Sequence, residues 1–188
     1  SKYLQELELS LEFLPMYLPF VIKKAPEVFV VQYGGGISTK VAVAAGASKV
    51  TVAEGNPLVL RTLKDTDLIT KLTGKPLDDK KVTVVPYNGR LYALGVENKY
   101  DIIDLSLADS TGLSNPGGFS IVEKYNYTRE TLQDYMRALA PSGVLSITLW
   151  NKEDLPKSIP KFFATAVSAA WARDGQEAAT KFFIVHTY

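Results

Sequence analysis

The stretch from residue 27 to residue 54, EVFVVQYGGGISTKVAVAAGASKVTVAE, constrains the fold more than any other part of this chain. It opens with Val28 to Val31, a continuous apolar run that is typical of a strand buried on both faces of a parallel sheet. Gly34, Gly35 and Gly36 follow at once. Because glycine has no Cβ, this loop can turn sharply and let a ligand approach the main-chain N–H groups at the start of the next helix.

The second half of this stretch completes a strand, loop, helix, strand unit. The sequence predicts a small-residue helix over residues 41–46, ended by Gly46, and a second buried strand over residues 49–53. Glu54 stands at the carboxyl end of that strand, where a ribose would present its two hydroxyls to a carboxylate acceptor. A plain strand-helix-strand unit with a tight turn and a solvated glutamate is the alternative interpretation.

The loop sequence GGGISTK narrows the class of nucleotide. A dinucleotide fingerprint needs a further glycine where this chain has Thr39, and the loop also lacks the Gly-Lys-Ser/Thr ending of a phosphate-binding P-loop. A diphosphate is therefore disfavoured. A nucleoside with a small charged tail, such as an S-adenosyl compound, needs only the glycine loop and the ribose carboxylate.

Composition limits the class of protein further. The chain has 188 residues, 46% hydrophobic and 22% charged, which suits one well-cored domain. A net charge of +1 without a basic stripe gives no reason to expect nucleic acid or an anionic membrane as a partner. With no cysteine and a single histidine, His186, we expect no disulfide and no thiolate or multi-histidine metal site.

Strand and helix patterns alternate along the rest of the chain. We therefore expect one α/β domain over residues 1–188, a doubly wound, mostly parallel, Rossmann-like sheet of the methyltransferase type in three layers. Residues 1–26 form a helical segment that packs on it, interrupted by Pro15 and Pro19. The further strands expected are 80–85, 101–105, 143–149 and 182–186, and the further helices are 56–72, 128–139 (capped by Thr128) and 159–172.

Ligands of such sheets bind at the carboxyl ends of the strands, and polar residues gather there. After the third strand, the Asn88 amide is a candidate hydrogen-bond partner for an adenine edge, with a plain Asn-Gly turn as the alternative. After the fourth strand, a long loop begins that contains Ser106 and Asp109. We predict nucleoside contacts at Tyr33, Gly34, Gly35, Gly36, Glu54, Asn88 and Gly89.

The motifs together resemble the spermidine synthase family of polyamine aminopropyltransferases, from about residue 14 to the end. The matching segments are QYGGGIS, VAEGNP, YNGR, KYDIIDLSLADS, YNYTRETLQDY and LAPSGVLSITLW, and the last two are most similar to uncharacterised bacterial synthase-like domains. The resemblance implies that Gly34, Gly36 and Glu54 hold decarboxylated S-adenosylmethionine or methylthioadenosine. It places Asn88 near the adenine, where the family usually has Asp.

The resemblance also implies a departure at the catalytic position. Ser106 stands where the catalytic Asp is expected, and Asp109 matches the second acid of the family's loop. Aminopropyl transfer needs a base, because an aliphatic ammonium with a pKa near 10 must lose its proton before it attacks. A serine hydroxyl cannot serve alone, so the candidate catalytic residues are Asp109, Asp104 and Ser106. Asp104 lies on the same face of the strand as Ser106.

Three interpretations of function stay open. The first is an aminopropyltransferase-type enzyme with an altered acceptor, the second is an S-adenosylmethionine-dependent methyltransferase, and the third is a non-catalytic binding domain. The expected partners are the nucleoside and an amine acceptor, with a homodimer as one possible assembly. We expect a cytoplasmic protein, or the soluble domain of a longer, membrane-attached one, of which this chain is a fragment.

Overall fold

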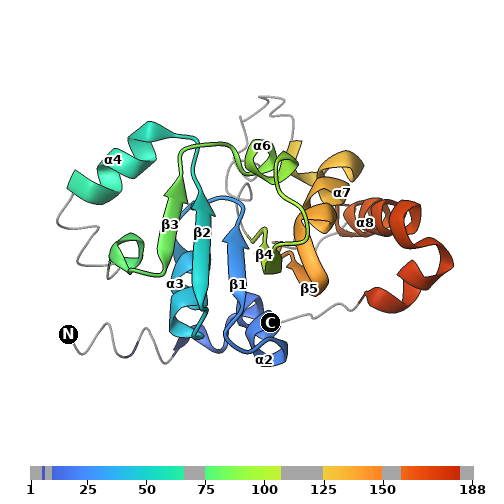
Figure 1. Ribbon diagram of the computed structural model, residues 1–188, viewed down its shortest axis with the longest axis horizontal. Helices are drawn as coiled ribbons and strands as arrows, with labels where there is room; N and C mark the ends of the chain where they lie inside the picture. The colour runs from blue at the N-terminus through green and yellow to red at the C-terminus, as the bar shows by residue number, and fades with distance from the viewer. Residues whose placement is uncertain (1–5, 7–9, 66–74, 107–124, 150–157, 183–188) are drawn as a thin grey trace.

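The computed structural model describes residues 6, 10–65, 75–106, 125–149 and 158–182. Within these, five parallel strands form one sheet in the order β3-β2-β1-β4-β5 (Figure 1). The strands are β1 (Glu27–Val30), β2 (Lys49–Ala53), β3 (Val82–Val85), β4 (Tyr100–Asp104) and β5 (Leu139–Ser146). The chain adds β2 and β3 on one side of β1 and then β4 and β5 on its other side. The strand order therefore reverses between β1 and β4. This confirms the predicted doubly wound α/β fold.

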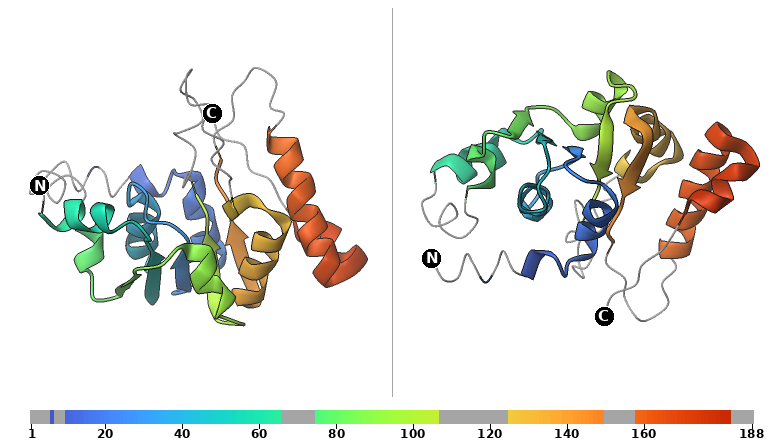
Figure 2. Two further views of the ribbon diagram at one scale, coloured as in Figure 1. Left: turned by 90° about the horizontal axis from the view of Figure 1, so that it is seen from above. Right: turned by 60° about the horizontal axis from the view of Figure 1, so that its bottom comes forward.

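Helices cover both faces of the sheet. The α-helices are α2 (Leu18–Ile22), α3 (Ile37–Ala44), α4 (Pro57–Asp65), α6 (Gly89–Leu94), α7 (Arg129–Ala138) and α8 (Ser158–Asp174). Short 3-10 helices are η1 (Pro15–Tyr17), η2 (Pro76–Asp78), η4 (Tyr125–Tyr127) and η5 (Gly175–Lys181). In both views of Figure 2, α2 and α6 lie on opposite sides of the sheet, so the predicted three layers are present.

Alternation along the strands divides the core between these layers. Val28 and Val30 of β1 and Ile102 of β4 pack with Ala42 of α3. The intervening strand residues, such as Phe29 and Ile103, pack instead with α7 and α8. Because side chains alternate between faces, a residue two positions beyond Ile102 also faces α3. That residue is Asp104.

Several boundaries differ from those predicted. Helix α3 begins at Ile37, directly after the glycine loop, because Gly36 itself is the N-cap. The turn expected to introduce β5 is instead an irregularity within that strand, where Ser142 has a φ of 61°. Gly143 is required there, since a Cβ would lie 2.9 Å from the carbonyl oxygens of Ala140 and Tyr100. Helix α6 was not predicted, because six residues after an Asn-Gly pair carry too little periodicity.

Some of the other predictions agree with the structure, and some concern residues that it does not describe. Thr128 caps α7, and its Oγ1 accepts a hydrogen bond from the N–H of Thr131 at 3.3 Å, as predicted. The N-terminal segment packs on α3 through Leu11 and Met16, which contact Val41. Residues 183–188, which include most of the expected sixth strand, lie outside the described residues, as does the end of the helix expected over residues 56–72.

Candidate functional site

The glycine loop, Glu54, Asn88 and the end of β4 meet at the carboxyl edge of the sheet. The N–H of Val31, just after β1, donates to the Asp104 carbonyl at 3.0 Å, and the N–H of Tyr33 donates to the Ala53 carbonyl at 3.0 Å. The chain leaving β1 is thus held between the ends of β4 and β2. This is the point where the strand order reverses, which is where open α/β sheets bind their ligands.

Two of the three loop glycines are explained by backbone geometry. Gly34 and Gly36 have φ angles of 54° and 80°, in the left-handed region that favours glycine. A Cβ on Gly36 would also clash with the ring and hydroxyl of Tyr33. Gly35 has no positive φ, and among the described residues no atom lies within 4 Å of the Cβ positions of Gly34 and Gly35. Gly35 is therefore the loop glycine that neither a positive φ nor a clash with a described residue explains, and it leaves space for a ligand.

Tyr33 is buried, with 3% of its surface exposed, and belongs to the core cluster between β1, β2 and α3. Its ring covers Gly36, and burial raises the pKa of its hydroxyl. Packing therefore accounts for this side chain. Nucleoside contact by Tyr33 stays a prediction.

Glu54 is buried, with 6% of its surface exposed, directly after β2. Its Oε1 accepts a hydrogen bond from the N–H of Asn56 at 2.7 Å, which anchors the carboxylate against the following turn. Within the described part of the chain, its Oε2 makes no hydrogen bond. The second oxygen can thus accept from a ligand hydroxyl, as the sequence analysis expected of a ribose carboxylate.

Asn88 and Gly89 lie beside Glu54 and begin α6. A Cβ on Gly55 would lie 3.2 Å from the Asn88 nitrogen, so the loops after β2 and β3 are in contact. Asn88 is the N-cap of α6, and its Oδ1 accepts from the N–H of Arg90 at 2.9 Å. The structure thus has a helix start where the alternative interpretation had a plain turn, and it leaves the side-chain NH₂ as the group with which Asn88 could meet an adenine nitrogen.

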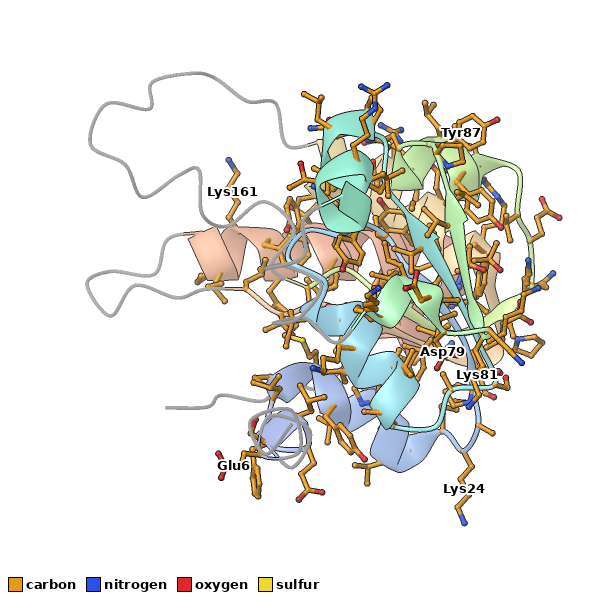
Figure 3. The ribbon with its side chains drawn as sticks, turned by 90° about the vertical axis from the view of Figure 1, so that its left-hand side faces the viewer. Glu6, Lys24, Asp79, Lys81, Tyr87 and Lys161 are labelled. Atoms are coloured by element: carbon orange, nitrogen blue, oxygen red, sulfur yellow. The ribbon has the colours of Figure 1, made fainter. Side chains whose placement is uncertain are left out.

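Gly89 is buried against β1, where a Cβ would clash with the Val31 carbonyl oxygen. Close packing of α6 onto the strand therefore requires this glycine. Its neighbour Tyr87 is 58% exposed at the carboxyl end of β3, whereas Lys81 lies at the amino end of that strand (Figure 3). The candidate site is at the Tyr87 end.

The end of β4 supplies the buried acid of the site. Asp104 is 5% exposed and Ser106 is 8% exposed. The Ser106 hydroxyl donates to Asp104 Oδ1 at 2.7 Å, while Asp104 Oδ2 is buried and has no hydrogen-bond partner in the described part of the chain. Asp109, the third candidate catalytic residue, lies outside the described residues.

Burial raises the pKa of the Asp104 carboxyl above its usual range, against the opposing effect of hydrogen bonding to Ser106. The hydroxyls of Ser38, in the first turn of α3, and of Ser146, at the end of β5, face the same carboxyl and also favour its ionised form. Neither closes a hydrogen bond to Oδ2. The sequence indicates Asp104 and Ser106 as candidates but gives no sign that Ser38 and Ser146 lie beside them.

A second feature lies away from this edge. A surface cavity of about 510 Å³ is lined by residues of α8 and by Arg129, including the exposed Phe163 and Trp171. None of the predicted site residues lines it. Among the described residues, no group of three or more acidic, histidine or cysteine side chains could hold a metal ion, and no helix is long and apolar enough to cross a membrane.

Known structures share this fold. The chain matches the spermidine synthase from Thermotoga maritima with a TM-score of 0.57 and 23% identity, over 86% of this chain and 50% of that one. It matches a candidate sarcosine dimethylglycine methyltransferase from Galdieria sulphuraria with a TM-score of 0.54 and 15% identity, over 88% and 61%. No family model matches the chain, and no curated protein matches it.

These likenesses define the class of the fold. The chain has the Rossmann-like α/β fold of S-adenosylmethionine-dependent methyltransferases and spermidine synthases. At these identities the likeness shows the fold alone. The chain spans about half the length of the spermidine synthase that it matches.

Proposed function

We propose that this chain binds an S-adenosyl nucleoside at the carboxyl edge of its sheet and belongs to a transferase that moves a carbon group from the sulfonium to an acceptor. The observation that carries this proposal is the convergence of the glycine loop, Glu54 and the Asp104–Ser106 pair at the point where the strand order reverses. Each part has a distinct task. Gly35 admits the nucleoside, Glu54 accepts from the ribose hydroxyls, and the acid lies where the reacting carbon would be.

We favour aminopropyl transfer, because the Asp104 carboxyl beside Ser106 is a candidate for the base that this reaction needs. In that reaction the acceptor nitrogen forms a bond to the carbon next to sulfur, the carbon–sulfur bond breaks, and its electron pair stays on the departing thioether. One proton leaves the nitrogen. The hydrogen bond between Ser106 and Asp104 offers that proton a path, since Ser106 can accept it and pass its own proton to Asp104 Oδ1. The acid that the resemblance expects at position 106 would thus act from position 104.

Methyl transfer is the second candidate, because the same structural class includes a candidate methyltransferase. That chemistry often needs only proximity and an oriented sulfonium, without a strong base. The two reactions leave different products. Aminopropyl transfer releases methylthioadenosine, and methyl transfer releases S-adenosylhomocysteine.

Calorimetric titration with S-adenosylmethionine, its decarboxylated form, methylthioadenosine and S-adenosylhomocysteine tests the proposal. We expect binding that weakens at least tenfold in Glu54→Gln, which keeps the Oε1 acceptor for Asn56 but replaces the second oxygen with an NH₂ group. Glu97→Gln is the matched control, because its side chain is 70% exposed and pairs only loosely with Arg137 at 3.9 Å. Absence of binding to all four nucleosides by folded protein would refute the proposal.

A further inference from the structure

Asp104 differs from the other acidic residues that the structure describes in where its carboxyl points. It is the last residue of β4 and pairs in register with Val30 of β1 and Ser146 of β5. By strand alternation it faces α3, on the same side as Ile102. Its carboxyl therefore lies against the first turn of α3, the helix that follows the glycine loop.

Among the residues that the structure describes, the surroundings of this carboxyl contain hydroxyls but no opposite charge. The groups that face it are Ser38 from α3, Ser146 from β5 and Ser106 just beyond β4. Within the part of the chain that the structure describes, no lysine or arginine forms an ion pair with Asp104. One of its oxygens, Oδ2, is buried and has no hydrogen-bond partner among the described residues. A buried carboxylate without a counter-charge is costly, so a lone carboxyl here favours its neutral form.

The position of Asp104 and its missing counter-charge point to a ligand that brings the charge itself. We propose that Asp104 is the counter-charge of a sulfonium nucleoside: its carboxyl is neutral in the ligand-free protein, releases its proton to solvent when the sulfonium binds, and takes a proton back when transfer converts the sulfonium to a thioether. This inference rests on the proposed function, since it assigns a charge partner within the same nucleoside site.

The change in the charge of Asp104 lets the site distinguish substrate from product. The sulfonium and the ionised carboxyl attract each other in a region of low dielectric, where such attraction is strong. After transfer the donor is an uncharged thioether, and the proton lost by the acceptor neutralises Asp104 through Ser106. A neutral carboxyl has no charge with which to attract the uncharged thioether. The product therefore leaves more readily than the substrate.

Proton release measured by calorimetry tests this directly. S-adenosylmethionine and S-adenosylhomocysteine differ at the sulfur by one methyl group and one charge, so they form a matched pair of probes. Titration of the wild-type chain near pH 6 in two buffers of different ionisation enthalpy gives the protons exchanged. We expect release of up to one proton with S-adenosylmethionine and close to none with S-adenosylhomocysteine. While Asp104 is neutral in the free protein, the affinity for S-adenosylmethionine then rises by up to tenfold per pH unit.

Substitution of Asp104 tests whether the proton released on nucleoside binding comes from its carboxyl. Asp104→Asn keeps the shape of the side chain but cannot ionise, so we expect it to abolish proton release and to lower the preference for S-adenosylmethionine over S-adenosylhomocysteine at least tenfold. Asp101→Asn is the control on the same strand, since that carboxylate is engaged by the N–H of Glu27 at 2.9 Å at the opposite edge of the sheet. It should leave both quantities unchanged.

The outcomes separate this inference from the proposed function. If both nucleosides bind without a difference in proton release, or if Asp104→Asn keeps the wild-type preference, the inference is wrong and the nucleoside site stands. If neither nucleoside binds to the folded wild-type chain, both are wrong. The proton count uses the unaltered protein, so it decides the matter even if Asp104→Asn does not fold.

Discussion

The Ser106 hydroxyl donates a 2.7 Å hydrogen bond to Asp104 Oδ1, and both side chains are buried at the carboxyl end of β4. This pair places the acid of the candidate site two residues earlier than the resemblance to spermidine synthases implies. A serine that accepts a proton and passes its own to a buried carboxyl can do what a directly exposed aspartate does. The missing aspartate at position 106 is thus no sufficient reason to exclude catalysis.

The raised pKa of Asp104 predicts a particular dependence of stability on pH. Between the ordinary aspartate pKa near 4 and the raised value, the unfolded chain has lost this proton while the folded protein still holds it. Raising the pH across that window therefore lowers the free energy of unfolding, by up to ~1.4 kcal/mol per pH unit for one proton. Above the raised pKa this contribution becomes constant.

Urea unfolding from pH 4 to pH 8 measures this slope. Asp104→Asn cannot bind the proton, so its stability should lack the decline, whereas Asp101→Asn should keep it. Identical slopes in the wild type and in Asp104→Asn would show that the carboxyl is ionised in the folded protein across this range.

The glycine loop predicts opposite results for two neighbouring positions. Gly36→Ala puts a Cβ at a φ of 80° and into the Tyr33 ring, so we expect a loss of about 1–3 kcal/mol in the free energy of unfolding. Gly35→Ala meets no atom of the described residues within 4 Å and should change stability by no more than about 1 kcal/mol. If the nucleoside lies against the loop, Gly35→Ala should instead weaken its binding. Equal stability losses at both positions would contradict the clash with Tyr33.

Gly89 gives a similar test of packing between α6 and β1. A Cβ there would clash with the Val31 carbonyl oxygen, so Gly89→Ala should cost about 3 kcal/mol or more, or prevent folding. Gly95→Ala is the control at the other end of α6, where the nearest atom to a Cβ would be 3.8 Å away. Thermal unfolding compares the two variants, and a Gly89→Ala variant as stable as Gly95→Ala would show that α6 is free to shift from the strand.

Asn88 allows the contribution of helix capping to stability to be tested. Asn88→Ala removes the acceptor for the Arg90 N–H, which should lower the free energy of unfolding by about 1 kcal/mol. Asn88→Asp keeps a capping oxygen and should restore most of that stability. A loss in Asn88→Asp as large as in Asn88→Ala, measured by urea unfolding, would show that the cap is not what stabilises α6.

The sequence predicted the sheet better than it predicted the surroundings of the acid. Buried parallel strands are nearly continuous apolar runs, so β1 and β2 could be located from the sequence. Glu54 followed from its place after a strand. By contrast, Ser38 and Ser146 reach Asp104 only because β4 lies between β1 and β5 in the sheet. No local sequence pattern predicts this order of strands.

Glycines and Asn88 show a second limit of sequence reasoning. The sequence does not distinguish a glycine that makes room for a ligand from a glycine that packing requires. Only the structure shows that a Cβ would clash with Val31 at Gly89 and with Tyr33 at Gly36, but not at Gly35. The Asn-Gly pair at residue 88 likewise suits a turn or a helix start. Contacts distant in the sequence decide which of these forms.

The position of the acid can be tested by exchanging the two residues of the pair. Ser106→Asp alone brings a second carboxyl to within hydrogen-bonding distance of Asp104, and two like charges in a buried site disfavour ionisation of both. We expect a loss of about 1–3 kcal/mol in the free energy of unfolding at pH 7. The double variant Asp104→Ser, Ser106→Asp restores one carboxyl and one hydroxyl, so it should recover most of that loss. A double-mutant cycle by urea unfolding measures the coupling, and additive effects would show that the two side chains do not interact.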